Sequence, residues 1–322
     1  MPHPLRKPLI LIAILLPATV LAAESPPPFE MAWGSFGSAA GQLWYPFGLA
    51  VDNGRGCLYV AEVQNHRIQK FSLSGVSLAR WGGLNPGTAD GEFSAPSGVV
   101  VDGSGNVFVA DRSNDRIQKF SSNGSFLMKW GTQGTGAGEL SEPQALALGP
   151  DGDVYVADTG NNRIQRFTSS GAYVLSWGSQ GTGTSQFSFV LGIAVDSAGD
   201  VYVSDSANHR IQKFHDDGTF VAVIVTGTQL NSPKGLALDS AGNLYVVDAG
   251  NNRIRKYTGD GVFLVGWGQY GTGDGQFVGP NGVALDSGGS VYVSDGSNRI
   301  QKFGTAVDVQ GTTWGRIKTL YP

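Results

Sequence analysis

The chain has 322 residues, 48 of which are glycine, and a formal net charge of −4. Hydrophobic residues make up 41% of the chain and charged residues 15%, so the sequence can bury a core and is not a typical disordered chain. The glycines follow no three-residue period, which excludes collagen, and their number argues against long helices because each glycine costs a helix interior about 1 kcal/mol.

The first 23 residues have the pattern of a secretory signal peptide. Arg6 and Lys7 precede an unbroken apolar run over residues 9–16, and alanines at positions 22 and 23 suit a cleavage site. An uncleaved membrane anchor is the alternative, but the apolar run is shorter than the roughly 20 residues that span a bilayer. We therefore expect a periplasmic or secreted protein with no membrane span after signal removal.

The mature part is expected to begin with a short linker over residues 24–28 and to be acidic. Loss of Arg6 and Lys7 leaves 20 basic and 26 acidic residues, a net charge of −6. An acidic exported protein is poorly suited to nucleic acid or anionic lipid, so we expect neither as a partner. Cys57 is the only cysteine, which excludes an intramolecular disulfide and a cysteine-based zinc site. We expect Cys57 to be buried and unreactive.

One heptapeptide recurs six times, with spacings of 43 to 49 residues between its arginines. Its copies, such as NHRIQKF at 65–71, follow two β-rich segments like GIAVD (192–196) and VYVAD (154–158), and four of the copies precede a run that ends in Trp-Gly. Each repeat thus predicts four short antiparallel strands, a to d in chain order, separated by polar and glycine-rich turns. A period of this length predicts an all-β fold, a six-bladed β-propeller over residues 29–303, with an open solenoid as the alternative.

The two ends of the repeat region are expected to meet in one blade. Residues 29–43 match the d strand and following loop at 126–140, whereas the last repeat has strands a, b and c over 282–303 and only a poor candidate for d. We predict that residues 29–34 form the outer strand of the last blade, which closes the ring and removes an exposed sheet edge. Residues 304–322 are then a C-terminal tail.

An acidic residue precedes each repeated arginine, by five positions in five repeats and by four in the last. The acid ends strand b and the arginine opens strand c, so the two side chains are expected to pair across the hairpin. Six equal ion pairs indicate a structural role rather than six active carboxylates. The pairs are Glu62–Arg67, Asp111–Arg116, Asp158–Arg163, Asp205–Arg210, Asp248–Arg253 and Asp295–Arg299.

Two further motifs suggest metal sites, and we interpret both as turns. His66 and His209 occupy one slot in repeats one and four, where other repeats have Asn or Asp, and they are expected to lie on opposite sides of the ring. The acidic runs at 151–153 and 216–218 lack the twelve-residue spacing of a calcium loop. Catalytic zinc needs three protein ligands and the sequence has four histidines in all, so we expect no metal or other cofactor.

The repeat resembles the NHL repeat, whose blades carry P-x-G-[IVL]-A-[VL]-D, then [IVL]-Y-V-[AS]-D, then N-[HN]-R-I-Q-[KV]-F. Here these motifs read PNGVALD (280–286), VYVSD (291–295) and NHRIQKF (208–214). The resemblance implies a six-bladed propeller of the exported bacterial type and says less about activity. In tripartite-motif ubiquitin ligases the propeller follows a RING finger, which a single cysteine cannot build. Peptidyl-hydroxyglycine amidating lyases are similar in fold but hold zinc with channel histidines, a set that this chain does not offer.

One position at the start of strand a, between Pro and Gly, differs in every repeat while its neighbours recur. Strand a lines the axis of a propeller, and its start lies on the face where the d–a and b–c loops emerge. Divergence within a repeated frame indicates a position that faces a ligand, with neutral drift as the alternative. The candidate binding residues are therefore Phe47, Ser97, Gln144, Leu191, Lys234 and Asn281 at the channel mouth, with Gln64 and Arg112 of the b–c turns.

Repeat four departs from the others because it lacks the Trp-Gly pair and has a short d–a loop around residues 225–233. The short loop is expected to lower the rim and leave a notch on the loop face. Aromatic residues of the longer loops could wall this notch or pack beneath their own loops; they are Trp44, Tyr45, Phe187, Phe189 and Tyr270.

These observations favour an exported, non-enzymatic binding module, a monomer whose rigid ring presents variable loops to a protein, peptide or glycan. The alternative is a channel-facing, metal-dependent lyase or hydrolase of the amidating-lyase type. The two hypotheses differ in the channel, because an enzyme of that type needs acidic or histidine side chains that converge at the top of the axis.

Overall fold

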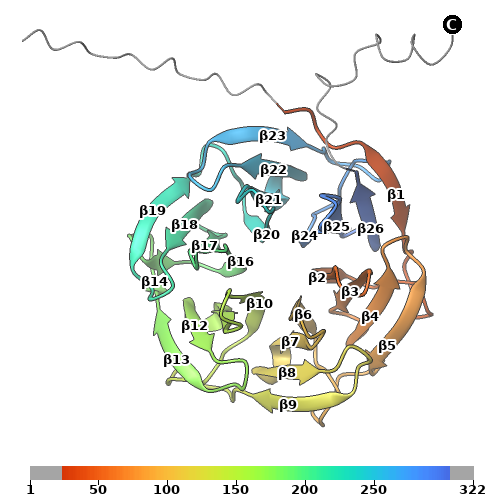
Figure 1. Ribbon diagram of the computed structural model, residues 1–322, viewed down its shortest axis with the longest axis horizontal. Helices are drawn as coiled ribbons and strands as arrows, with labels where there is room; N and C mark the ends of the chain where they lie inside the picture. The colour runs from red at the N-terminus through yellow and green to blue at the C-terminus, as the bar shows by residue number, and fades with distance from the viewer. Residues whose placement is uncertain (1–23, 305–322) are drawn as a thin grey trace, which may run out of the picture.

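A computed structural model describes residues 24–304, which form six four-stranded antiparallel sheets arranged as blades around a central axis (Figure 1). This confirms the all-β, six-bladed propeller that the repeat predicts. The predicted signal peptide and residues 305–322 of the predicted tail lie outside the described residues. Within residues 24–304, no helix is long and apolar enough to cross a membrane.

Every blade repeats one order of strands from the axis outward. The innermost strands are β2 (Pro46–Asp52), β6 (Pro96–Val101), β10 (Pro143–Leu148), β16 (Val190–Val195), β20 (Pro233–Leu238) and β24 (Val283–Leu285). The second strands are β3 (Cys57–Glu62), β7 (Val107–Asp111), β11 (Val154–Asp158), β17 (Val201–Asp205), β21 (Leu244–Asp248) and β25 (Val291–Asp295).

The third strands carry the repeated heptapeptide, and the outer strands carry the aromatic ends. The third strands are β4 (Arg67–Ser72), β8 (Arg116–Phe120), β12 (Arg163–Phe167), β18 (Arg210–Phe214), β22 (Arg253–Tyr257) and β26 (Arg299–Phe303). The outer strands are β5 (Ser77–Gly82), β9 (Phe126–Trp130), β13 (Tyr173–Trp177), β19 (Phe220–Val225), β23 (Phe263–Trp267) and β1 (Phe29–Trp33). The loops add β14 (Ser179–Gln180), β15 (Gln186–Phe187) and three short turns of 3₁₀ helix, η1 (Arg112–Asn114), η2 (Thr159–Asn161) and η3 (Ala249–Asn251).

The ring closes through the N-terminal strand, as the sequence predicts. β1 pairs antiparallel with β26, with Trp33 opposite Ile300, and Figure 1 shows it outside β26 in the last blade. The ring of Phe29 lies edge-on to that of Phe303, with 6.0 Å between centroids. Residues from the two ends of the chain therefore share one sheet, which satisfies a strand edge that would otherwise be open to another chain.

The core lies between neighbouring blades, which explains why the second strands are apolar on both faces. Each residue of β7, for example, is buried. At the outer edge, Trp81 of one blade covers Gly124 of the next, and a methyl group on that glycine would lie 2.7 Å from the indole. Gly124 also has a φ of +83°, so it is required both for its turn and for this contact. Cys57 is buried as expected, and burial raises the pKa of its thiol.

Candidate functional site

A ring of close backbone contacts surrounds the axis at the start of the innermost strands. A methyl group on Gly98 would lie 2.8 Å from the carbonyl oxygen of Gln144, and one on Gly235 would lie 2.8 Å from that of Asn281. The same substitution would overlap the neighbouring blade at three other positions, Gly48, Gly192 and Gly282. Gly282 meets the carbonyl of Phe47, so the contact also joins the last blade to the first. The glycine of this motif sets how closely the blades approach around the channel.

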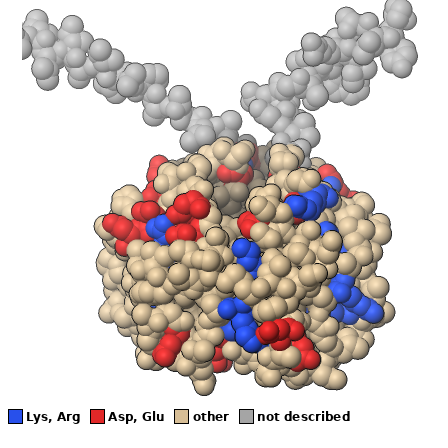
Figure 2. All heavy atoms as spheres, turned by 60° about the horizontal axis from the view of Figure 1, so that its bottom comes forward, with Lys and Arg blue, Asp and Glu red and all other residues tan. Residues whose placement is uncertain are grey.

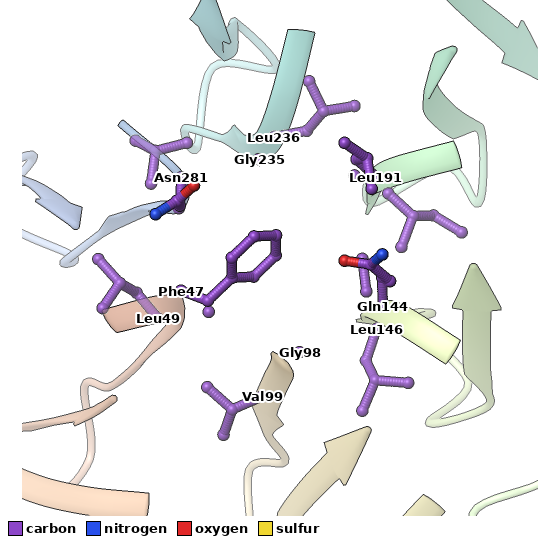
Figure 3. Close-up of a pocket in the computed structure, with 16 residues that line it drawn as sticks. Phe47, Leu49, Gly98, Val99, Gln144, Leu146, Leu191, Gly235, Leu236 and Asn281 are labelled. Atoms are coloured by element: carbon purple, nitrogen blue, oxygen red, sulfur yellow. The ribbon is translucent and has the colours of Figure 1, made fainter. Parts of the chain in front are cut away.

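A small hollow of about 60 Å³ opens at this ring. Four of the predicted residues line it: Phe47, Gln144, Leu191 and Asn281. Figure 3 shows the ring of Phe47 projecting from β2 toward the axis, with Asn281 on one side and Gln144 and Leu191 across from it. The structure therefore brings residues from four blades together around one space.

Sequence reasoning missed a second layer of the same hollow. Apolar residues two positions further along the innermost strands also line it, and they are Leu49, Val99, Leu146, Ile193, Leu236 and Val283. Alternate residues of a strand point to the same side. Counting two residues along the strand from each divergent position would therefore have identified these residues from the sequence.

Lys234 is not among the residues that line the hollow, but its ammonium contacts two residues that are. Its Nζ donates to Oδ1 of Asn281 at 2.7 Å and lies 6.0 Å from the ring centroid of Phe47. No salt bridge joins it to a carboxylate within residues 24–304. Burial lowers the pKa of Lys234, because desolvation disfavours its charged form. In the described part of the chain, the ammonium thus contacts a neutral amide and an aromatic face and pairs with no carboxylate.

Two of the predicted residues also join neighbouring blades. Ser97 is almost fully buried, and its Oγ donates to the carbonyl oxygen of Pro143 at 3.2 Å. Asn281 donates from Nδ2 to the carbonyl oxygen of Pro46 at 3.2 Å. The backbone carbonyl oxygen of Asn281 accepts the N–H of Gly235 at 3.0 Å. Ser97 is not among the residues that line the hollow. Its divergence therefore has a structural use in the contact between blades.

The two predicted turn residues do not reach the hollow. Gln64 is exposed on the turn between β3 and β4. Arg112 lies half-buried at the start of η1, and its Nε is buried without a hydrogen-bond partner within the described residues. Neither residue is among those that line the hollow. The prediction that they bind a ligand remains a prediction.

The six predicted ion pairs are present, with 2.6 to 3.1 Å between Nε and the carboxylate oxygen. In the third blade, Asp158 also accepts the backbone N–H of Ser141 at 2.7 Å and the side-chain amides of Asn161 and Gln165. Arg163 in turn donates to three carbonyl oxygens of the loop that precedes β10. Each buried acid therefore organises the loop above its blade, which is the structural role that the repeat predicts.

The histidine slot is a contact between blades. His66 has a φ of +50°, and its Nδ1 accepts the backbone N–H of Ala95 at 3.0 Å. His209 does the same for Ser232, and Asn162 accepts the N–H of Phe189 through its side-chain oxygen. Burial lowers the pKa of His66, which keeps the ring neutral and able to accept this bond. An acceptor that tolerates left-handed backbone explains the choice among His, Asn and Asp.

The acidic runs form ion pairs. Asp151 and Asp153 both pair with Arg166, the latter at 2.8 Å, and Asp216 reaches the same guanidinium at 3.3 Å. Asp217 accepts the N–H of Thr219 within its turn. Within residues 24–304, no group of three or more His, Cys, Asp or Glu side chains is placed to hold a metal ion.

The aromatic residues of the loop face divide into two groups. Phe187 is fully buried, so it packs beneath its own loop and does not wall a notch. Exposed rings remain at Trp44, Tyr45, Phe189 and Tyr270. Phe36, which sequence reasoning did not single out, is exposed and lies 5.3 Å from Trp44, while Tyr45 stacks on Phe47 at 6.5 Å. One loop thus carries aromatic contacts from the rim to the hollow.

The charged side chains form no extended field on the face seen in Figure 2. Lys, Arg, Asp and Glu of the described part lie in small mixed groups there, separated by uncharged surface. Nucleic-acid binding usually requires a continuous basic patch. The lining of the hollow is also uncharged, since it consists of apolar side chains, two amides and glycine backbone.

Comparisons with known proteins agree with this architecture. The NHL-repeat sequence profile matches residues 93–120, 140–167, 187–214, 230–257 and 277–303. The first repeat is not among these matches. This repeat has Glu62 where the others have Asp, and it carries Trp44 and Tyr45. A search of curated protein sequences gave no significant match.

Among solved structures, a virginiamycin B lyase from Staphylococcus aureus is similar at 16% identity and a TM-score of 0.58, over 83% of this chain and 97% of that one. A gluconolactonase from Xanthomonas campestris is similar at 14% identity and a TM-score of 0.62, over 87% and 96%. A streptogramin B lyase is similar at 17% identity and a TM-score of 0.56, over 80% and 92%. At these identities the likeness establishes the fold alone. The chain is a six-bladed β-propeller of the NHL-repeat family.

Proposed function

We propose that this propeller is a non-enzymatic binding module that seats a carboxylate of a protein or peptide partner at the mouth of its channel. The observation that carries the proposal is the ammonium of Lys234, which lies beside a preformed hollow with a neutral amide as its hydrogen-bond partner. A carboxylate at this point would supply the missing opposite charge. Charge-assisted hydrogen bonds are roughly twice as strong as neutral ones.

The rest of the hollow suits an organic group that carries such a carboxylate. Phe47 and Leu191 offer apolar surface, and the amide of Gln144 faces the same space. From Phe47 the aromatic contacts continue through Tyr45 to the exposed rim at the first blade. A peptide could therefore place its acidic group in the hollow and lay neighbouring side chains on the aromatic rim, where rigid rings are effective anchors.

The lining favours binding over acid–base or metal chemistry. Within the described residues, the side chains around the hollow include no carboxylate, imidazole or thiol. A lyase or hydrolase of the metal-dependent kind needs such groups to hold an ion or to transfer a proton. The similar lyases and gluconolactonase suggest an enzyme only through the shared fold.

Fluorescence polarisation with labelled peptides tests the proposal. One pool of hexapeptides carries free carboxylates, and a matched pool has every carboxylate replaced by an amide. Lys234→Met should weaken binding of the first pool about tenfold, the loss of one charge-assisted hydrogen bond. Lys119→Met is the control, because Lys119 lies on β8 and bonds to the carbonyl of Ser169 outside the channel. Equal binding by both variants, or a preference for amidated peptides or neutral glycans, would overturn the proposal.

We also propose that the protein acts outside the cytoplasm and as a monomer. The proposal of export rests on the pattern of residues 1–23, and the monomer is proposed because one ring contains the whole hollow. Cell fractionation and the mass of the purified protein by light scattering test the two statements separately.

A further inference from the structure

In five of the six repeated arginines, the guanidinium group donates hydrogen bonds to carbonyl oxygens of the loop that leads into the innermost strand of the same blade. In the third blade Arg163 donates from Nη1 to the carbonyl of Thr135 at 2.7 Å and from Nη2 to those of Gly136 and Glu139 at 2.8 Å. The arginines at positions 67, 116, 210 and 299 each make three equivalent bonds. In these blades the loop covers the guanidinium with three oxygens.

The fifth blade differs because the loop that leads into it, the short d–a loop of repeat four, has fewer residues. Seven residues, 226–232, join β19 to β20, whereas twelve, 131–142, join β9 to β10. The end of the loop is kept, since Leu230 is buried and the N–H of Asn231 donates to Asp248. The turn that supplies two of the three carbonyl oxygens in the other blades, those of Thr135 and Gly136 in the third blade, is missing here. Among the described residues, Arg253 therefore has one carbonyl partner, Gln229 at 3.1 Å. Its side chain is 36% exposed, against 3–14% for the other five arginines.

A second guanidinium stands beside the first. The residue two positions after the arginine is a fully buried glutamine in the other five blades, but it is Arg255 here. Nη1 of Arg255 donates to the same carbonyl oxygen, that of Gln229, which places the two guanidinium groups next to each other. Arg255 also stacks on the ring of Phe263, with 4.3 Å between the guanidinium carbon and the ring centroid.

The surroundings leave this pair accessible and positively charged. The cross-strand neighbour of Arg255 is Gly266, where the first two blades have Arg80 and Lys129. Asp248 is bonded to Arg253, and within residues 24–304 no salt bridge joins Arg255 to a carboxylate. One carboxylate thus accompanies two guanidinium groups, which leaves a net charge of about +1 and several free N–H donors.

We infer that Arg253 and Arg255 form a binding site for a tetrahedral oxyanion, the sulfate or phosphate group of a ligand, on the loop face of the fifth blade. The oxygens of the anion would take the positions that two loop carbonyls occupy in the other blades. Arginine forks match such groups because they offer two parallel donors, and Arg255 is held in place by Phe263. The site is separate from the hollow at the channel mouth, so it stands independently of the proposed function.

Side-chain NMR of the arginine Nε–H groups tests the inference directly. Titration with inorganic sulfate and with inorganic phosphate should shift the Arg253 and Arg255 signals in a saturable manner, and the stronger of the two anions identifies the kind of ester the site prefers. Sodium acetate and sodium chloride at equal ionic strength report carboxylate binding and simple screening. Lys234→Met should leave these titrations unchanged, which separates this site from the channel mouth.

Arg255→Gln is the decisive variant, because it restores the glutamine that five blades already carry and is therefore expected to fold. It should weaken anion binding about tenfold. Arg80→Gln is the matched control, since it removes one exposed positive charge from the equivalent part of the first blade. The inference is overturned if Arg255→Gln binds like the unmodified protein, if Arg80→Gln has the same effect, or if shifts rise linearly without saturation as they do with chloride.

Discussion

Gly235→Ala tests whether the glycine ring positions the channel mouth. Gly235 does not have the left-handed backbone that favours glycine, so alanine is not strained at this residue itself. Its new methyl group would lie 2.8 Å from the carbonyl oxygen of Asn281 and 3.0 Å from the Cα of Gly282. Both atoms belong to the backbone of the next blade and cannot rotate away. The substitution must therefore separate two blades or displace Asn281, the partner of Lys234.

The expected cost follows from this geometry. Overpacking of a well-filled interior costs about 1–3 kcal/mol. Alanine in place of glycine also restricts the unfolded chain and returns about 0.4–1 kcal/mol. The net loss in the free energy of unfolding is therefore about 0–2.6 kcal/mol, with a midpoint of about 1.3 kcal/mol. Because Asn281 moves, carboxylate binding at the channel mouth should weaken as well.

Urea denaturation and peptide binding measure the two effects. Gly103→Ala is the matched control, because nothing lies within 4 Å of its new methyl group and its backbone is not left-handed. Gly103→Ala should be neutral or slightly stabilising and should bind like the unmodified protein. If the two variants have the same midpoint and slope, the glycine ring does not set the spacing of the blades and the reasoning fails.

Three other substitutions test the remaining contacts. His66→Asn should reduce the loss of stability on acidification. Burial lowers the pKa of His66, so as pH falls below about 6.5 the unfolded chain binds a proton before the folded protein does. The amide of asparagine, in contrast, accepts the N–H of Ala95 at any pH. Urea curves at pH 7.5 and 5.0 should show a smaller difference for the variant, and equal differences would contradict this role. Lys234→Met should be more stable than the unmodified protein, with the largest difference near neutral pH. The difference should shrink as pH rises toward 10.5, because the lowered pKa of Lys234 lets the folded protein release the lysine proton before the unfolded chain does. An advantage that does not change with pH would refute the burial of a charged amine. Asp158→Asn should cost about 3 kcal/mol by leaving Arg163 without its buried partner, whereas the exposed Asp151→Asn should cost far less; similar midpoints for both would contradict the structural role.

The sequence by itself determined the repeated architecture, because each repeat carries its own local instructions. Glycine and asparagine turns, apolar triplets and the acid–arginine pair are properties of a few adjacent residues. They specify a four-stranded blade, and six copies specify the ring. Even the closing strand was predictable, since residues 29–34 repeat a pattern whose partner strands lie at the other end of the chain.

The tertiary structure decided which of the divergent residues share a site. Ser97 and Phe47 occupy the same place in the repeat, yet Ser97 bonds to the next blade while Phe47 projects into the hollow. The isolation of the Lys234 ammonium depends on residues from other blades, and so does the pairing of Arg253 with Arg255 beneath a shortened loop. These features arise from distances between blades, and no stretch of sequence within one repeat encodes such distances.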